Sequence, residues 1–287
     1  MLKILNSWWI FMILYLVFVA IFNQFVKIST KTSKHDGALT AILQLVAGIS
    51  VLVFIPFFEI KFPTDYKIWL FLGLSIIFYA INDRIHTTAR KNLEVSMDSI
   101  LRQLSTVFVF IVGITFFKEE SSLFKILGIT LILFSNILIL YSKGNFKLNK
   151  YVWINLISIL SYSIATCLDV GNSGNFTLPI YISTTLVVPA ILIIIFEKIK
   201  LKELKDEFLT GNKKAILIGG LSWGLLILAL LRAYGLADVT IISPLSALSV
   251  IINVIVSYIF LKERNSIVKK IISAVGIAIG VLLITIF

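Results

Sequence analysis

Polar side chains that could do chemistry interrupt an apolar stretch in "YAINDRIHTTARKN", residues 79–92. Asn82, Asp83, Arg84 and His86 lie within five positions of one another. A carboxylate can bind an amine or carry a proton, a guanidinium matches carboxylate or phosphate through paired hydrogen bonds, and an imidazole exchanges protons near neutral pH. Their chemistry depends on whether they lie in water or inside a membrane, where ionisable groups mark functional sites.

The composition places the chain among polytopic membrane proteins. Of 287 residues 59% are hydrophobic and 14% are charged, and the mean hydropathy is +1.01. Short polar breaks divide the chain into segments of about 20 apolar residues, the length that crosses roughly 30 Å of hydrocarbon. We predict an all-α integral membrane protein with ten transmembrane helices, at approximately 8–27, 38–58, 67–89, 96–117, 123–141, 151–169, 177–196, 214–235, 238–260 and 267–287.

Helix length indicates where the polar set of residues 82–86 lies. From Trp69 to Ile81 there are 13 residues, about 20 Å of helix at 1.5 Å per residue, which is too short to span the membrane. Continuing to Ala89 restores a full crossing and puts the polar set inside the bilayer. The alternative is a helix that ends at Ile81, followed by a solvated loop or by side chains that reach back to the interface.

The chain also repeats itself, because a shift of 144 residues aligns its first half with its second. The two units, residues 1–145 and 146–287, each carry five predicted helices. Since five is odd, the second unit must enter the membrane from the opposite side, which gives inverted repeats around a site near the midplane. Identical residues matched by this shift are Trp9 and Trp153, Ala89 and Ala233, Val95 and Val239, Ser99 and Ser243, Lys118 and Lys262, and Glu119 and Glu263.

A second polar cluster follows on the fourth predicted helix. Asp98 and Arg102 are four residues apart, hence on one face, and Gln103 is adjacent. The alternative is an intrahelical pair that only lowers the cost of burying both charges. Neither cluster has charged counterparts in the second half, so the architecture itself does not require them; the matched positions hold Leu226, Ile227, Leu228, Leu230, Ile242, Ser246 and Ala247.

Two strings carry the repeat: "ARKNLEVSMDSILRQLSTVFVFIVGITFFKEESSLFKILGITLIL" and "AYGLADVTIISPLSALSVIINVIVSYIFLKERNSIVKKIISAVGIAI". Both resemble the repeat of the drug/metabolite transporter superfamily, EamA type, in the Ala-containing end of the third helix, the small-polar fourth helix and the "KE" turn before the fifth. The resemblance covers essentially the whole chain and implies a ten-helix transporter. Thr106 and Val250 stand near positions where that family commonly has a proline, so a gating role of that proline does not transfer.

The resemblance implies a central cavity formed by the third, fourth, eighth and ninth helices. It would gather Arg84, His86, Arg102, Gln103 and Arg232. Polar residues on the first two helices could line the same space or hydrogen-bond neighbouring helices. The candidate substrate-binding residues are therefore Asn82, Asp83, Arg84, His86, Asp98, Arg102, Gln103, Arg232, Asn23, Gln24 and Gln44.

Lysine and arginine predict the orientation. The loops on the side of the amino terminus carry 5 of them and the opposite loops carry 18, so the second side should be cytoplasmic and both termini non-cytoplasmic. We expect the cytoplasmic (inner) membrane of a prokaryote. The net charge of +11 then reflects topology and contacts with anionic lipid, and no nucleic-acid partner is expected. Segment 197–214 should form a short helix on this surface.

These features predict a secondary transporter that works by alternating access. The chain has no G-x-x-x-x-G-K-[ST] loop, so a gradient or exchange must supply the energy. Arginines within the spans favour an anionic or zwitterionic small metabolite, whereas Asp83 or Asp98 could neutralise an arginine, bind an amine or carry a coupling proton, a role that His86 also suits. The expected partners are this substrate, the lipid bilayer and a proton or exchanged metabolite, without cofactor or metal; a monomer suffices, and a dimer is compatible.

Two other functions are compatible with such a chain. The same fold could translocate a lipid-linked or amphipathic substrate through a laterally open cavity. A membrane-embedded enzyme would need a metal-ligating pair such as H-E-x-x-H, or a nucleophile with a base. The two histidines, His35 and His86, lack that spacing, which disfavours an enzyme.

Overall fold

The computed structural model describes residues 7–120, 122–142, 145–146 and 149–286. Within these residues, nine helical segments are long and apolar enough to cross a membrane. They are α1 (Trp8–Thr32), α2 (Asp36–Val51) with the 3-10 helix η2 (Leu52–Phe57), α3 (Tyr66–Asn92), α4 (Val95–Leu101) with α5 (Gln103–Thr115), α7 (Lys150–Asn172) with the 3-10 helix η3 (Ser173–Asn175), α8 (Leu178–Phe196), α10 (Lys213–Tyr234), α11 (Val239–Ser246) with α12 (Ser249–Phe260), and α13 (Ile267–Ile286).

The remaining predicted span, 123–141, coincides with helix α6 (Leu123–Leu140). Its apolar stretch among the described residues is shorter, Leu123–Ser135, so the tenth crossing stays a prediction. Two-residue strands β1 (Tyr141–Ser142) and β2 (Asn145–Phe146) pair antiparallel after it. A separate short helix, α9 (Leu201–Thr210), forms within the predicted surface segment 197–214.

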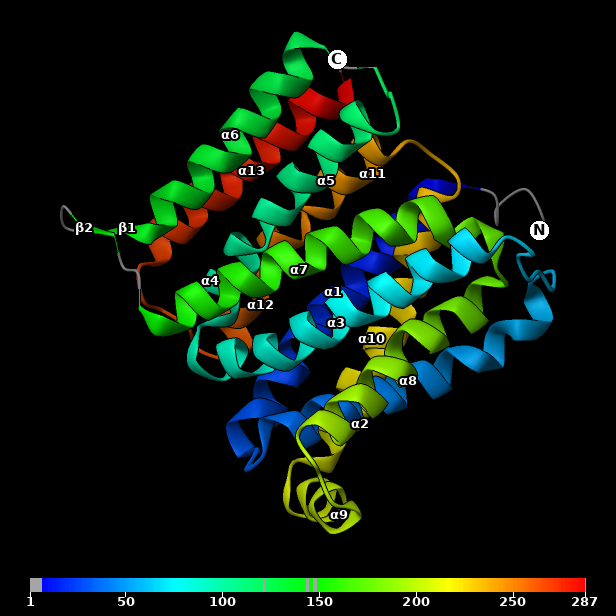
Figure 1. Ribbon diagram of the computed structural model, residues 1–287. Coiled ribbons are helices and arrows are strands. Elements are labelled where there is room, and N and C mark those ends of the chain that lie inside the picture. Colours follow the sequence, from blue (N-terminus) through cyan, green and yellow to red (C-terminus); the bar gives the residue numbers. More distant parts are fainter. Residues whose placement is uncertain (1–6, 121, 143–144, 147–148, 287) are drawn as a thin grey trace.

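The helices pack in pairs across the bundle (Figure 1). Helices α6 and α13 pack together at one edge, and α2 and α8 form another pair toward the opposite edge. Between these edges α1 packs on α10 and α3 packs on α7, while α4 contacts α12 and α5 contacts α11. Each of these pairs joins a helix that precedes residue 145 to one that follows it.

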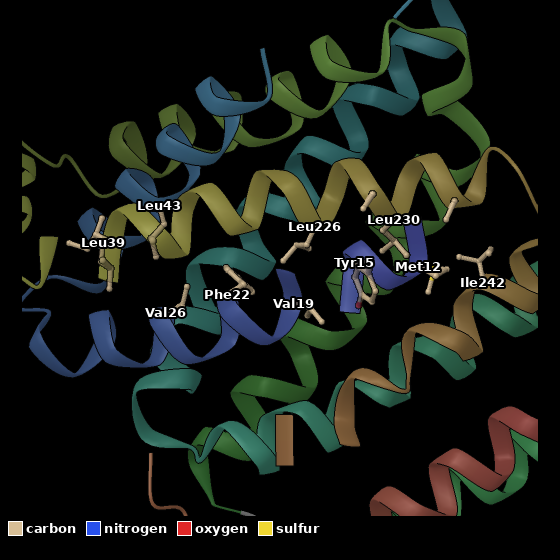
Figure 2. Packing of buried hydrophobic residues seen from close by; sticks show 13 residues of the cluster. Met12, Tyr15, Val19, Phe22, Val26, Leu39, Leu43, Leu226, Leu230 and Ile242 are labelled. Carbon is tan, nitrogen blue, oxygen red and sulfur yellow. The ribbon is translucent and has the colours of Figure 1, made fainter. Parts of the chain in front are cut away.

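The largest buried apolar cluster ties α1 to α2, α10 and α11 (Figure 2). It includes Tyr15 and Phe22 from α1, Leu43 from α2, Leu230 from α10 and Ile242 from α11. Outside the bundle, large apolar side chains are exposed instead, as expected of a surface that faces lipid. Examples are Ile13, Val53, Phe57, Phe116, Phe134, Ile195 and Phe260.

Helix α3 runs for 27 residues, straight through the polar set of residues 82–86. The alternative of a helix that ends at Ile81 is therefore wrong. Its carbonyl end is capped from α1, because Lys27 Nζ donates to the carbonyls of Arg90 (2.5 Å), Lys91 (3.1 Å) and Leu93 (2.5 Å). This ammonium satisfies backbone acceptors that a helix end leaves open and favours its negative dipole end.

Lys27 itself corrects a prediction, since it was expected at the end of a span. Helix α1 continues to Thr32, and Lys27 is 7% exposed. Lys27 therefore lies within the bundle, where it caps the end of α3, and it is not an exposed charge of a loop.

Candidate functional site

A cavity with about 1100 Å³ of empty space, including the part that is open solvent, lies among the helices of both halves. Helices α1, α3, α4, α5, α7, α8, α10, α11 and α12 all contribute to its wall. The apolar part of the wall comes mainly from α10. The polar and tyrosine side chains that line it are Tyr15, Asn23, Tyr79, Asn82, Asp83, His86, Arg90, Asp98, Ser99, Arg102, Gln103, Ser105, Thr106, Tyr162, Thr166, Asp169, Thr185, Ser246, Ser249 and Asn253.

One face of α3 supplies the centre of this wall. Asn82, His86 and Arg90 follow one another at intervals of four residues, so they stack along a single helical face. Each is buried, with at most 8% of its surface exposed. Arg90 belongs to the loop charges counted in the sequence, but the extension of α3 brings it inside the protein.

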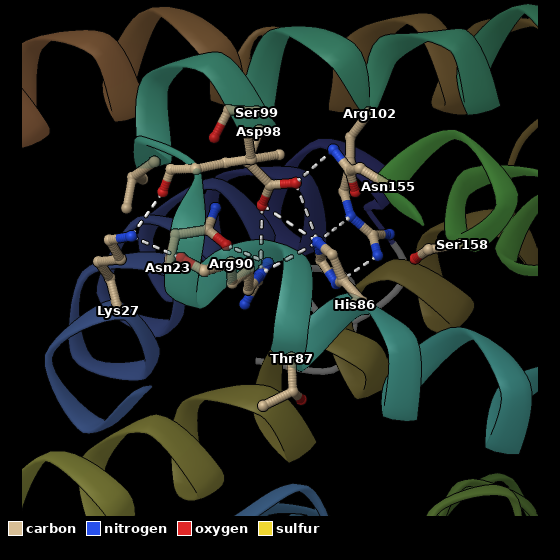
Figure 3. Close-up of polar contacts among 12 residues, drawn as sticks. Asn23, Lys27, His86, Thr87, Arg90, Asp98, Ser99, Arg102, Asn155 and Ser158 are labelled. Carbon is tan, nitrogen blue, oxygen red and sulfur yellow. Dashed lines mark hydrogen bonds and ion pairs between the residues drawn. The ribbon is translucent and has the colours of Figure 1, made fainter. Parts of the chain in front are cut away.

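Asp98 on α4 joins this face into a buried ion-pair cluster (Figure 3). Its carboxylate lies 2.9 Å from His86 Nε2 and 3.2 Å from Arg90 Nε, and accepts a hydrogen bond from Asn155 Nδ2 at 3.0 Å. Arg90 Nη2 also donates to Asn23 Oδ1 at 2.7 Å. The alternative of an intrahelical pair between Asp98 and Arg102 is therefore wrong, because the basic partners of Asp98 come from α3.

Arg102 lies at the break between α4 and α5 and reaches the same histidine. Its Nε donates to His86 Nε2 at 3.1 Å, and its Nη2 donates to Asn82 Oδ1 at 3.2 Å. The guanidinium carbon stands 4.7 Å from the ring centre of Tyr162, a cation–π contact. Among the described residues no carboxylate lies within ion-pair distance of Arg102, and its side chain is partly exposed in the cavity.

His86 Nε2 faces Asp98 and both arginines, so its tautomer decides which of them it bonds. A protonated Nε2 donates to Asp98 and leaves Nδ1 to accept from Arg102 Nη2 at 2.6 Å, whereas an unprotonated Nε2 accepts from Arg90 or Arg102. The His86 ring can therefore exchange one hydrogen-bond partner for another when one of the arginines moves.

Asp83, which is also on α3 and lines the cavity, has its own set of donors. Gln44 Nε2 from α2 donates to it at 2.7 Å and Asn82 Nδ2 donates at 2.5 Å. Asp83 is 6% exposed and has no basic residue within ion-pair distance in the described part of the chain. Gln44 acts from behind the cavity wall, as support for this carboxylate.

The structure brings most predicted site residues together and leaves others out. Asn23, Asn82, Asp83, His86, Asp98, Arg102 and Gln103 line the cavity. Arg84 points away and bonds Glu197 and Thr88. Gln24 is buried outside the lining without a hydrogen-bond partner among the described residues, and Arg232 lies 6.0 Å from the Phe58 ring centre, outside the lining.

Two residues of the wall with basic or acidic side chains, Arg90 and Asp169, were absent from the predicted site. The position of Arg90, one turn after His86 on the same face, was the signal that could have found it. Asp169 on α7 is 1% exposed and accepts hydrogen bonds from Tyr79 and Tyr181, each at 2.6 Å. Its signal was an acidic residue within a predicted span, which by itself marks a candidate site.

Comparisons with known proteins agree with this architecture. A family model described as "EamA-like transporter family" matches residues 6–141. No curated protein matches the chain in sequence. A solved structure titled "Crystal structure of protein" has a TM-score of 0.69 at 12% identity, over 96% of each chain, a likeness that shows the fold alone. Residues 6–141 of this integral membrane protein therefore match the EamA-like transporter family of the drug/metabolite transporter superfamily.

Proposed function

We propose that the protein is a secondary transporter that moves a small polar metabolite, anionic or zwitterionic, by alternating access. The cavity carries this proposal, because it places a hydrogen-bonded set of charged side chains within a bundle of membrane-spanning helices. Ionisable groups at such depth cost several kcal/mol unless they pair or face a wet space. The substrate is moved without chemical change, so no enzymatic step is involved.

Arg102 supports the choice of substrate. Arg90 is already paired with Asp98, whereas Arg102 presents a guanidinium to the cavity with only neutral hydrogen-bond partners among the described residues. A carboxylate or phosphate can replace those partners through two parallel hydrogen bonds. Asp83, one turn of α3 away from His86, offers a negative group for the amine of a zwitterion.

Many transporters achieve alternating access with two structurally equivalent halves, and reciprocal helix capping supports such halves here. Glu119 accepts the backbone N–H of Val239 at 3.1 Å, at the start of α11. Glu263, which matches Glu119 in the 144-residue shift, accepts the N–H of Val95 at 2.8 Å, at the start of α4. Val95 and Val239 match each other in the same shift. Each half therefore caps a helix of the other half with the same residue type.

The packing of the helices supports the inverted arrangement as well. The shift maps α1 onto α7 and α3 onto α10, so the packed pair α1–α10 becomes the packed pair α7–α3. The pairs α2–α8 and α6–α13 map onto themselves. We infer a ten-helix transporter, with α6 as the tenth crossing, in which the halves rock about the central cavity; both halves are in one chain, so a monomer suffices.

For the orientation, we propose that the side carrying α9 is cytoplasmic, in the inner membrane of a prokaryote, with both termini outside. Lys27 and Arg90 no longer count as loop charges. The lysines that remain on that side, including exposed Lys200, Lys202 and Lys205 on or beside α9, still outnumber those opposite, as the positive-inside rule requires.

Thermal stabilisation of the detergent-purified protein tests the substrate class, since a ligand that binds only the folded state raises Tm. The panel is glucose 6-phosphate, UDP-glucose, succinate, alanine and choline. We expect an anion or zwitterion to raise the Tm of the wild type and of Arg264→Ala, whose residue is exposed in a loop. Arg102→Ala should lose that shift while remaining folded. A shift by choline alone, or an unaltered shift in Arg102→Ala, would contradict the anion site.

A further inference from the structure

Asp169 lies in the cavity wall far from the cluster around Asp98. The separation can be measured along α7, because Asn155 of this helix donates a hydrogen bond to Asp98, and Asp169 comes 14 residues after Asn155. At 1.5 Å per residue, that separation is about 21 Å along the helix. The cavity wall therefore has Asp98 and Asp169 at different depths, in addition to Asp83, and of these three only Asp98 has basic partners within ion-pair distance in the described chain.

The surroundings of Asp169 are neutral. Tyr79 from α3 donates to Oδ2 and Tyr181 from α8 donates to Oδ1, each at 2.6 Å. The segment after α5 presents Phe117 beside this end of α7, and α10 presents apolar Leu231 to the cavity. On α7 itself the next titratable group of the cavity wall is Tyr162, seven residues earlier, which carries the guanidinium of Arg102 on its ring.

A carboxylate buried in a membrane protein without a cationic neighbour is costly to keep charged, which favours the neutral acid and makes the residue a candidate proton site. Both charge states of Asp169 can be satisfied in place. The anion accepts two phenol hydrogens, and the neutral acid donates its own O–H to one phenol oxygen while the other phenol still donates to it. A hard metal cation takes about six or more oxygen ligands, and no group of three His, Cys, Asp or Glu residues able to hold a metal occurs in the described ranges.

We propose that Asp169 is the coupling-proton site of the transporter, an inference that rests on the proposed function. A proton from water binds the carboxylate when the cavity is open to the acidic side, and the same proton leaves to water after the halves have rocked. No other bond forms or breaks. Asp98 keeps its ion pair with Arg90 throughout. Asp98 therefore orders the substrate region, whereas Asp169 gains and loses the proton.

The first test needs no substrate. Infrared spectra of the protein in liposomes, recorded as the pH is raised, should lose a protonated-carboxyl C=O band that belongs to a buried acid. A component of this band should be missing in Asp169→Asn and retained both in Asp83→Asn, the other buried acid of the wall without a basic partner, and in Asp206→Asn, whose residue is exposed on α9. A band that is unchanged in Asp169→Asn would overturn the proposal.

The second test separates coupling from binding, with radiolabelled succinate and alanine as probes in proteoliposomes. Asp169→Asn should keep counterflow but lose accumulation driven by a pH gradient, and Asp169→Glu should restore part of it. Accumulation at the wild-type level, accumulation that follows a Na⁺ gradient instead, or a joint loss of counterflow in a folded variant would each overturn the proposal. Absence of any wild-type counterflow would count against the proposed function with these probes, while the infrared result still decides the titration of Asp169.

Discussion

At the scale of single residues, the cluster around Asp98 shows how a membrane protein holds several charges. Arg90, His86 and Asn155 all contact one carboxylate, and no residue of this group exposes more than 8% of its surface. Removing one member of a buried pair costs more than the pair contributes, because the other charge is left without compensation.

Asp98→Asn should therefore lower the free energy of unfolding by about 3–5 kcal/mol, since Arg90 loses its counter-charge. The double variant Asp98→Asn with Arg90→Gln should recover part of the loss. Arg84→Ala is the matched control, because the Arg84–Glu197 pair is 29% exposed on both sides and should contribute at most about 1 kcal/mol. Unfolding in detergent measures all three; equal effects of Asp98→Asn and Arg84→Ala would contradict the role of burial.

The partners of Asp98 could not be predicted from spacing. Four residues to Arg102 is the right interval for a pair on an isolated helix. The chain reverses at Leu93, however, and brings Arg90 within 3.2 Å of the same carboxylate. That reversal depends on tertiary packing, so the residue types of the site were predictable while their pairing was not.

At the scale of helices, the pair α6–α13 is held by close backbone contact. A Cβ on Gly280 would lie 2.6 Å from the carbonyl oxygen of Gly128, and one on Gly128 would meet the carbonyl oxygen of Gly280. Neither backbone can give way without separating the two helices. Small residues at helix crossings have this use in membranes, where packing and not the hydrophobic effect brings helices together.

Gly280→Ala should consequently destabilise the protein by about 1–3 kcal/mol, as overpacking does. Gly73→Ala is the control, because nothing lies within 4 Å of a Cβ at that position of α3, and alanine in a helix is favoured over glycine by up to about 1 kcal/mol. Thermal melts in detergent should show Tm falling in the first variant and holding or rising in the second. A fall of equal size in both would show that the α6–α13 contact is loose.

Helix lengths were the most predictable feature of this chain. The crossing length alone indicated that α3 continues through residues 82–86, and it does. The end of α1 was predicted too early, at residue 27, because a lysine after an apolar run usually marks the interface. Here Lys27 donates to three carbonyls and stays inside. A charged side chain therefore marks the end of a membrane span only where no protein group replaces water as its hydrogen-bond partner.

At the scale of the whole molecule, the orientation in the membrane can be measured from both faces. With Cys167, the sole cysteine, replaced by serine, a cysteine is placed at exposed Glu59 or at exposed Lys202 on α9. We expect a membrane-impermeant maleimide to label Glu59→Cys in intact cells and Lys202→Cys only after permeabilisation, because basic loops stay in the cytoplasm. The reverse pattern would place the termini inside.

The exchange of caps between Glu119 and Glu263 has a consequence for how such a chain can change over generations. The starts of α4 and α11 each rely on a carboxylate of the other half, which lies 168 residues away for Val95 and 120 residues away for Val239. If one half were replaced by that of a related protein, the new half would have to supply both the glutamate and the helix start that the other half needs. The lipid-facing surfaces are free to drift, whereas these two joints keep the halves matched to each other.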